Sequence, residues 1–296
     1  MHAHQMPPMP MPNDVLVSVY IPTKDRQPLL AAAIDSVLKQ TYRHLEVIVV
    51  DDGSTDGTQE YLRQLAHDDP RVRTIRHDTS KGGPAARNAA ILAARGAFVT
   101  GLDDDDSFEP FRIDDFVRAW RQFEVQGERP SCLYSQLREI QHGQHVATSD
   151  RPDRASYEDM FRHNAVGNQV FAPKAHFVDA GLFRVDLPAW QDLEFFMRML
   201  RTFGPARLVE RASYNFENSP RDDRITAKGE GKIRQAFAVL DAAHSGGIGR
   251  RSQLLQLQMF ARVYGIKPTL QDYRRFLAHG FWPRGFARML KRSLQA

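Results

Sequence analysis

The sequence predicts an α/β fold with a Rossmann-like, mostly parallel central sheet flanked by helices. Over residues 15–100, short apolar runs rich in β-branched residues alternate with longer segments whose apolar residues recur at helical spacing. The connections have the length that lets a helix return the chain to begin another parallel strand. Neither a Gly-x-Gly-x-x-Gly nor a Gly-Lys-Ser/Thr phosphate loop occurs in this segment, so a nucleotide would have to be held in another way.

The elements of this sheet can be placed from their apolar runs and their turn residues. The first strand, over 15–21, is β-branched and stops at Pro22, and Pro28 opens the helix that follows. The second strand, over 46–50, ends in the polar turn 51–57. The full prediction is strands over 15–21, 46–50, 71–76 and 97–100, alternating with helices over 28–40, 58–66 and 84–94.

The composition suits one large globular domain or two smaller ones. Of the 296 residues, 42% are apolar, which is enough for a proper core. The single cysteine, Cys132, excludes an internal disulfide framework, and we interpret it as a small buried hydrophobic residue. No apolar stretch approaches the roughly 18–20 residues that span a bilayer. Residues 1–14 lack the apolar core of a signal peptide, so we expect a flexible tail and a cytoplasmic protein.

Four consecutive carboxylates, Asp103 to Asp106, directly follow the apolar run 97–100. Packing four anions together is repulsive, and a turn needs only one Asp. A solvated acidic turn is one interpretation. However, α/β folds bind ligands at the ends of such strands, and hard divalent cations take oxygens from both carboxylates and diphosphates. The cluster therefore indicates an enzyme that acts on a nucleotide-diphosphate compound with a divalent metal, Mn²⁺ or Mg²⁺.

Five segments, in this order along the chain, resemble those of glycosyltransferase family 2. They are PTKDR at 22–26, SVLKQT at 36–41, VVDDGSTDGT at 49–58, GGPAARN at 82–88 and LDDDD at 102–106. The resemblance covers residues 15–110 and extends more weakly to residue 230. It implies a GT-A fold, a nucleotide-sugar donor, a divalent metal and inversion at the anomeric carbon.

The resemblance also implies how the donor is held. In the family, a carboxylate after the second strand accepts a hydrogen bond from the base, and an aromatic-type side chain after the first strand covers it. Asp52 and Lys24 hold these positions; Lys24 replaces the frequent Tyr, and its alkyl stem could pack on the base. Arg87, early in a helix preceded by two glycines, would face an anion, the alternative being a surface arginine. The predicted donor-binding residues are Pro22, Thr23, Lys24, Asp25, Arg26, Asp51, Asp52, Gly82, Arg87, Asp103 and Asp104.

Within the acid cluster, the family's Asp-x-Asp motif falls on Asp103 and Asp105, which are the predicted metal ligands. Asp105 would touch the metal directly, and Asp103 or Asp104 would contact the ribose or a metal-bound water. Asp106 is an extra acid, so the register is open by one residue. Asp51 has an equal alternative as an acid at the N-terminus of a helix.

A helix over 190–200 carries the predicted catalytic base. It resembles the family's Glu-Asp-x-Asp-Leu helix start, with Gln191 in place of the Glu. Asp192 has the position of the base that takes the acceptor hydroxyl's proton on the side opposite the leaving group. Its alternative is an acid favoured by the helix dipole. Trp190 could be a platform for the acceptor sugar or a core residue.

The remaining segments complete the predicted domain organisation. A strand is expected over 167–172, and the polar segment 218–226 resembles the family's mobile loop that closes over the diphosphate. Arg221 and Arg224 could contact phosphate there, unless the segment is a solvated linker. We expect a tail over 1–14, a glycosyltransferase domain over 15–228 with a nucleotide-sugar half (15–110) and an acceptor half (111–228), and a helical region over 229–296.

The C-terminal segment is strongly basic. Residues 262–296 contain eight Lys or Arg residues and one acid, Asp272, with aromatic residues interleaved. Such a pattern could rest on anionic lipid headgroups as a peripheral membrane contact, or it could be an ordinary terminal helix packed on the domain. Nucleic acid is not an expected partner, because the acid cluster and the other motifs point elsewhere.

Three functions are compatible with these features. The favoured one is an inverting glycosyltransferase that uses a UDP- or dTDP-sugar and a saccharide or lipid-linked saccharide acceptor. The resemblance places it in bacterial cell-surface polysaccharide or lipopolysaccharide synthesis. A sugar nucleotidyltransferase would use a related sheet, but it needs a Gly-rich loop where residues 22–26 have no glycine. A non-catalytic nucleotide-sugar-binding protein would not need both the acid cluster and Asp192.

Overall fold

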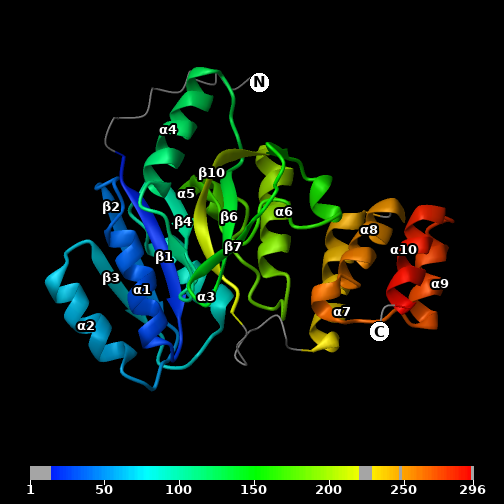
Figure 1. Ribbon diagram of the computed structural model, residues 1–296, viewed down its shortest axis with the longest axis horizontal. Helices are drawn as coiled ribbons and strands as arrows, with labels where there is room; N and C mark the ends of the chain where they lie inside the picture. The colour runs from blue at the N-terminus through cyan, green and yellow to red at the C-terminus, as the bar shows by residue number, and fades with distance from the viewer. Residues whose placement is uncertain (1–14, 220–228, 247–248, 295–296) are drawn as a thin grey trace, which may run out of the picture.

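A mixed, ten-stranded sheet forms the centre of the computed structural model, which describes residues 15–219, 229–246 and 249–294 (Figure 1). The strands are β1 Val17–Thr23, β2 Leu45–Asp51, β3 Val72–Arg76, β4 Phe98–Gly101, β5 Ser107–Phe108, β6 Leu133–Gln141, β7 Gln144–Thr148, β8 Arg154–Ala155, β9 Phe171–Pro173 and β10 Ala206–Glu217. Their order in the sheet is β3-β2-β1-β4-β9-β6-β10-β5, with β7 paired to β6 and β8 to β10.

The first half of the sheet is parallel, as predicted. β1 lies between β2 and β4, and β3 pairs with the far side of β2, all in parallel register. β1 and β2 are buried along nearly their whole length because helices cover both faces of a parallel sheet. Consequently the loops that follow Thr23, Asp51 and Gly101 all leave from the same edge.

Two helical layers enclose the sheet. One face is covered by α1 (Gln27–Leu38), α2 (Thr58–Asp68) and α4 (Arg112–Val125), and the other by α3 (Gly83–Ala93), α5 (Lys174–Asp179) and α6 (Gln191–Phe203). Successive strand residues point to opposite faces, so Val17, Val19 and Ile21 pack in the first layer while Tyr20 packs in the second, against Phe177.

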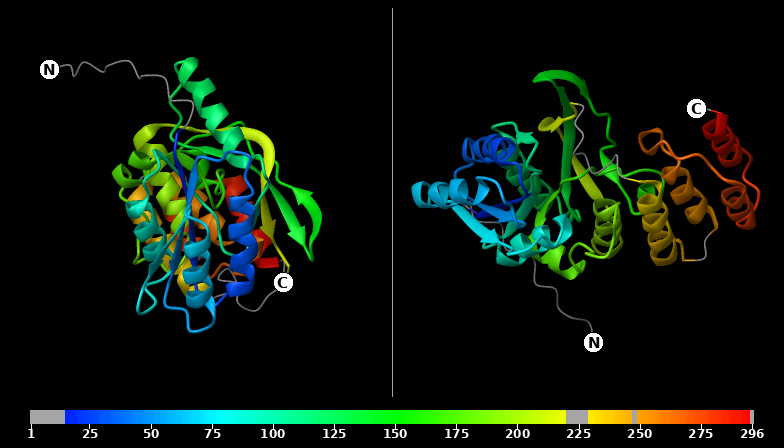
Figure 2. Two further views of the ribbon diagram at one scale, coloured as in Figure 1. Left: turned by 90° about the vertical axis from the view of Figure 1, so that its left-hand side faces the viewer. Right: turned by 90° about the horizontal axis from the view of Figure 1, so that it is seen from below.

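The second half of the sheet is mixed. β9 runs antiparallel to both β4 and β6, whereas β10 runs parallel to β6. β6 and β7 form an antiparallel hairpin that extends to one side of the molecule (Figure 2). The strand predicted over 167–172 was partly wrong: β9 begins only at Phe171, and Asn168 and Gln169 instead turn toward the acid cluster. A short 3₁₀ turn spans Asp159–Phe161.

The C-terminal part is helical, as predicted, and lies at the end of the molecule opposite α2 (Figures 1 and 2). Phe237 and Phe260 belong to the same buried cluster as Phe196 of α6, so this part shares a core with the sheet domain. None of the described helices is both long and apolar enough to cross a bilayer. The elements are α7 Glu230–Leu240, a π-helix Asp241–Ser245, α8 Gly249–Met259, a 3₁₀ turn Arg262–Tyr264, α9 Leu270–Ala278 and α10 Pro283–Leu294.

Candidate active site

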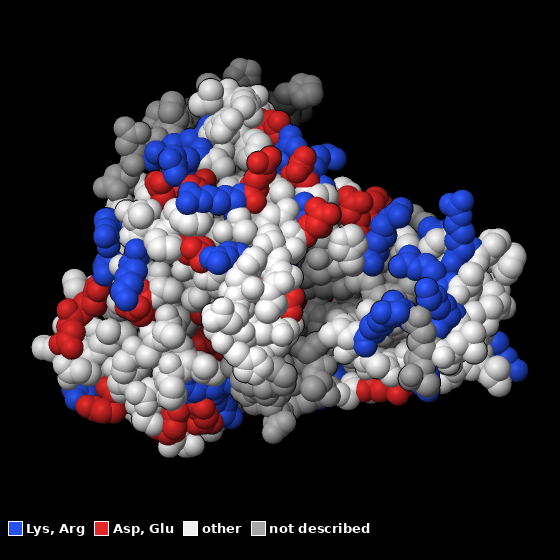
Figure 3. All heavy atoms as spheres, viewed as in Figure 1, with Lys and Arg blue, Asp and Glu red and all other residues white. Residues whose placement is uncertain are grey.

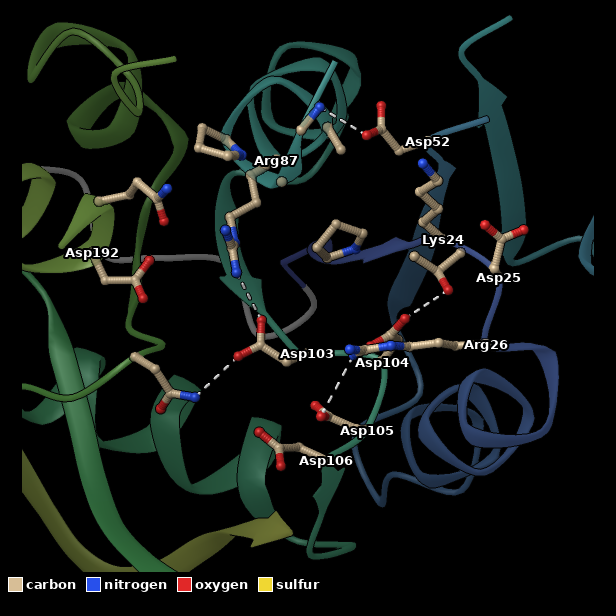
Figure 4. A pocket seen from close by; sticks show the side chains of 18 of the residues that line it. Lys24, Asp25, Arg26, Asp52, Arg87, Asp103, Asp104, Asp105, Asp106 and Asp192 are labelled. Atoms are coloured by element: carbon tan, nitrogen blue, oxygen red, sulfur yellow. Dashed lines mark hydrogen bonds and ion pairs between the residues drawn. The ribbon is translucent and has the colours of Figure 1, made fainter. Parts of the chain in front are cut away.

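A cavity of about 710 Å³ lies at the edge where β1, β2 and β4 end (Figure 4). Loops after all three strands contribute to it, together with the start of α3 and the start of α6. It therefore brings together residues from both halves of the predicted glycosyltransferase domain. The predicted site residues that line it are Pro22, Thr23, Lys24, Asp25, Arg26, Asp52, Gly82, Arg87, Asp103, Asp104, Asp105, Gln191 and Asp192.

Asp52 anchors the loop that leads into α3. Its carboxylate accepts hydrogen bonds from Ser80 Oγ at 2.7 Å and from the backbone N–H groups of Lys81 and Gly82 at 2.9 and 2.8 Å, and it contacts His77 Nδ1 at 2.6 Å. These contacts outweigh burial and lower the pKa of Asp52 to about 2. Because a carboxylate has about four acceptor positions, a donor base would have to share or displace one of these partners.

Asp51 does not line the cavity, in contrast to its predicted role in donor binding. One oxygen accepts the Ser54 N–H at 2.8 Å, and the other pairs with Arg76. Asp51 therefore closes the turn after β2. Nor does it cap a helix, because α2 begins only at Thr58.

The loop after β1 is tied to two neighbouring loops. Asp25, in a left-handed conformation with φ of 54°, accepts the Thr55 N–H at 2.6 Å. Arg26 reaches the acid cluster, with its Nη1 3.1 Å from Asp104 and 3.6 Å from Asp105. Lys24 is exposed at the cavity wall. This loop therefore contributes cations to a cavity that is otherwise rich in carboxylates.

The four consecutive acids have different surroundings. Asp104 is buried and accepts from Thr23 Oγ1 at 2.7 Å, and burial raises its pKa to about 6. Asp106 is also buried and accepts from Tyr214 Oη and from the Glu217 N–H. The Asp103 and Asp105 side chains are more exposed, at 23% and 20%. All four acids line the cavity, but Asp104 and Asp106 are the more deeply buried pair, and Asp103 and Asp105 are the more accessible one.

Asp103 and Asp105 offer a donor set that fits a hard divalent cation. No group of three or more His, Cys, Asp or Glu side chains in the described ranges is arranged to hold a metal by itself. Mg²⁺-type sites, however, use one or two carboxylates and complete the shell with substrate phosphates and water. Burial, together with the charges of Asp103 and Asp105, raises the pKa of Asp106, because nearby like charges disfavour its ionised form.

Arg87 and Asp192 face each other across the cavity from the starts of α3 and α6 (Figure 4). Arg87 Nη2 donates to Asp103 at 3.0 Å, and its guanidinium lies over the Phe183 ring. Asp192 Oδ1 is buried and has no hydrogen-bond partner in the described part of the chain. Burial raises the pKa of Asp192 to about 6, with Arg87 opposing and Asp103 adding to the increase.

The other predicted acceptor-side residues are divided between two places. Gln191 lines the cavity, and its Nε2 donates to Leu187 O at 2.9 Å. Trp190 does not line this cavity; it lines a second one, where its Nε1–H donates to Tyr264 Oη at 2.9 Å. Arg221 and Arg224, predicted to contact phosphate, lie outside the described residues.

Sequence reasoning missed a set of residues that hold the acid cluster in place by hydrogen bonds and packing. Asn168 and Gln169 donate to Asp103 at 3.1 and 3.0 Å. Tyr214 Oη donates to Asp106 and accepts the Asp103 N–H. Arg112 is buried against the Tyr214 ring. The only available signal for these residues was their polarity within otherwise apolar segments. Their contacts with the cluster could not be predicted, because β10 lies more than a hundred positions from it in the sequence.

The chain matches the model of glycosyl transferase family 2 over residues 18–183. A protein named a colanic acid biosynthesis glycosyl transferase, WcaA of Escherichia coli strain K12, is 36% identical over 268 residues, which cover 90% of this chain and 94% of that protein. The UDP-Glc:alpha-D-GlcNAc-diphosphoundecaprenol beta-1,3-glucosyltransferase WfgD of Escherichia coli is 28% identical over 155 residues, or 52% of this chain and 59% of that protein.

Solved structures with the same fold include S. aureus TarS 1-349 in complex with UDP-GlcNAc. Its TM-score is 0.67 at 17% identity, covering 94% of this chain and 89% of that one. The mannosyltransferase PcManGT from Pyrobaculum calidifontis, in complex with GDP-Man and Mn²⁺, has a TM-score of 0.53 at 18% identity, covering 94% and 73%. The family model, the relative aligned along nearly its whole length and the shared architecture agree: the chain belongs to glycosyltransferase family 2 and is a glycosyltransferase with the GT-A fold.

Proposed function

We propose that the enzyme transfers a sugar from a UDP- or dTDP-sugar to a saccharide acceptor with inversion, by a single displacement in which Asp192 is the base. The observation that carries this proposal is the place of Asp192. It lines both the first cavity, where the donor would bind, and the neighbouring second cavity. Its buried Oδ1 has no hydrogen-bond partner among the described residues. A base for direct displacement must stand between donor and acceptor in this way.

The donor would lie along the strand-end edge of the first cavity. The nucleobase of the donor would reach the loop held by Asp52, beside Lys24. The diphosphate would lie near Arg26 and Arg87. Asp105 and Asp103 would hold a divalent metal with the diphosphate oxygens, and when bound this ion would neutralise charge that develops on the leaving diphosphate. Support for a metal also comes from the Mn²⁺ named in the PcManGT complex.

Asp192 would act on the acceptor hydroxyl. A carboxyl with a pKa of about 6 is largely ionised at neutral pH yet more basic than an ordinary Asp. As the hydroxyl oxygen forms its bond to the anomeric carbon, its proton passes to Asp192, and the bond to the donor's phosphate oxygen breaks on the opposite face. Arg87, which lowers the pKa of Asp192, would limit how tightly the proton is held.

The acceptor is proposed to be a saccharide or lipid-linked saccharide in bacterial cell-surface polysaccharide synthesis. The names of WcaA, a colanic acid biosynthesis protein, and of WfgD, which acts on a sugar linked to diphosphoundecaprenol, support this class. The nucleotidyltransferase alternative is less well supported, because it gives Asp192 no role between two cavities.

The test is the anomeric configuration of the product together with the Asp192→Asn variant. An α-linked donor should give a β-linked product by NMR, and Asp192→Asn should bind UDP like the wild type while losing about 10²–10⁴-fold in rate. Asp186→Asn, which changes an exposed carboxylate paired with Arg184 in the preceding loop, is the matched control and should keep full activity. A product with the donor's configuration, or an Asp192→Asn enzyme with the rate of the wild type, would contradict the proposal.

A further inference from the structure

The second cavity, of about 420 Å³, lies between the start of α6 and the C-terminal helices. Gln191 and Asp192 line both cavities, so the two meet at the proposed base. Its volume falls in the range of about 300–1,000 Å³ that is usual for small-molecule sites. A site of this size beside the base could hold the sugar that accepts the transfer.

One wall of this cavity is an aromatic pair held in place by a hydrogen bond. Trp190 and Tyr264 lie with ring centroids 6.2 Å apart, and the Trp190 Nε1–H donates to Tyr264 Oη at 2.9 Å. Trp190 adopts a left-handed conformation with φ of 59° immediately before α6. Such a bond fixes the orientation of both amphipathic rings, which can present an apolar face to a sugar and a polar edge to its hydroxyls.

The charge of the lining is strongly one-sided. Arg162, His163, Arg288 and Arg292 all line this cavity, and Asp192 is the only carboxylate among its lining residues in the described ranges. Arg288 and Arg292 are four residues apart on α10, so they lie on the same face of that helix. Lys and Arg side chains also gather over the C-terminal helices in the space-filling view (Figure 3). An electrically neutral sugar would not need this arrangement.

We propose that the second cavity selects an anionic acceptor, namely a saccharide that carries a phosphate or diphosphate close to the accepting sugar. The anion would be held by Arg162, Arg288 and Arg292, and the sugar would lie on the Trp190–Tyr264 pair with its hydroxyl toward Asp192. Guanidinium groups suit this role because their planar donors match phosphate oxygens in pairs. The inference rests on the proposed function, since it takes Asp192 as the base at which the two cavities meet.

The test is the binding of three probes to the full chain at saturating UDP, measured by calorimetry. The probes are a short-chain alkyl diphosphate of α-GlcNAc, α-GlcNAc 1-phosphate, and uncharged octyl α-GlcNAc. The wild type should bind at least one anionic probe about tenfold or more tightly than the uncharged one. Arg162→Glu and Arg288→Glu should each weaken that binding about 10–100-fold, the range for loss of a hydrogen bond to a charged group.

The matched control is Lys232→Glu, which reverses an exposed charge on α7 outside the lining and should bind the probes like the wild type. If only the alkyl diphosphate binds, the acceptor is a lipid-linked saccharide. If the sugar phosphate binds equally well, a phosphate on the sugar is enough for recognition. Equal binding of charged and uncharged probes, no binding of any probe, or Arg288→Glu that binds like the wild type would overturn the inference. Failure of the proposed function would appear separately, as a wild type that does not bind UDP.

Discussion

At the residue scale, the same side chain has different acidity according to its partners. Asp52 receives four polar contacts, and its pKa falls to about 2. Asp192 is held in the cavity wall, where one of its oxygens is buried with no hydrogen-bond partner among the described residues, and its pKa rises to about 6. Hydrogen bonds to a carboxylate stabilise the charged form, whereas burial without them favours the neutral form. The first residue is therefore suited to holding a loop, and the second to accepting a proton.

The raised pKa of Asp192 predicts an acid limb in the rate profile. The ionised form is the active base, so kcat/KM for the acceptor at saturating donor should be constant above about pH 7 and fall through pH 6, approaching tenfold per pH unit. The measurement is an initial-rate series from pH 5 to 9, with enzyme stability checked at each pH. The residual activity of Asp192→Asn should lack this limb. A wild-type profile that stays flat down to pH 5 would exclude Asp192 as the titrating base.

At the scale of elements, the β4–β5 loop shows how the fold assigns roles to neighbouring acids. β10 lies beside β5 and reaches the loop through Tyr214 and the Glu217 N–H, which donate hydrogen bonds to the two oxygens of Asp106. Thr23, at the end of β1, donates a hydrogen bond to Asp104. Asp105 is left facing Arg26 at the cavity wall, where a bound diphosphate would arrive.

This assignment predicts that Asp105 makes nucleotide binding depend on metal. In thermal-shift and calorimetric titrations, Mn²⁺ should strengthen UDP binding to the wild type, and Asp105→Ala should weaken it by about tenfold or more and remove the effect of a chelator. Asp35→Ala, which changes an exposed carboxylate on α1 away from the cavity, should keep the Mn²⁺ dependence. UDP affinity that is unchanged by both the chelator and Asp105→Ala would show that this loop binds no metal.

At the scale of the whole molecule, some side chains of the basic C-terminal segment, residues 262–296, pack against one another, and others are exposed to solvent. Trp282 stacks on Phe276 beneath Arg250, and Phe286 packs against Tyr273, as expected of an ordinary terminal helix. Phe281 remains 68% exposed. Other large apolar side chains exposed on α9 and α10 are Leu270, Leu277, Leu290 and Leu294. Exposed apolar and basic side chains on adjacent helices suit a membrane surface.

We therefore predict salt-sensitive binding of the full chain to anionic liposomes. The variant with Lys267, Arg274 and Arg284 all changed to Glu should float less than the wild type, and 1 M salt should release the wild type because the screening length falls from about 10 Å at 0.1 M to about 3 Å. A variant with Lys39, Arg43 and Arg63 changed to Glu, on the distant α1–α2 side, is the charge-matched control. Equal flotation of both variants would leave the C-terminal helices with a packing role alone.

Point substitutions are preferable to removing residues 262–296 in this experiment. Phe276 and Met289 are fully buried in the cluster that also contains α6 residues, and Tyr264 holds Trp190. Deleting the segment would expose that core and alter the second cavity, because large-to-small changes at buried positions typically cost about 2–5 kcal/mol each. Loss of flotation by a truncated chain could then reflect unfolding.

The sequence by itself determined the parallel half of the sheet and the ends of its strands. Apolar runs such as 47–50 favour burial on both faces of a sheet, and parallel strands bring their carboxyl ends to one edge. The resemblance to glycosyltransferase family 2 then assigned Asp52, Arg87 and the acid cluster to one donor site, and all of these residues line one cavity. The helix that carries Asp192 near its start was also predictable, from its spacing of apolar residues.

Only the tertiary structure decided which polar residues face the cavity and which hold the fold. Asp51 and Asp52 are adjacent and chemically identical, yet one pairs with Arg76 and the other lines the cavity, because successive strand-end residues point in opposite directions. Tyr214 reaches Asp106 across 108 positions of sequence. The second cavity likewise joins α6 to α10. Local patterns record burial and periodicity, whereas such contacts depend on how distant elements pack, which no short window of sequence contains.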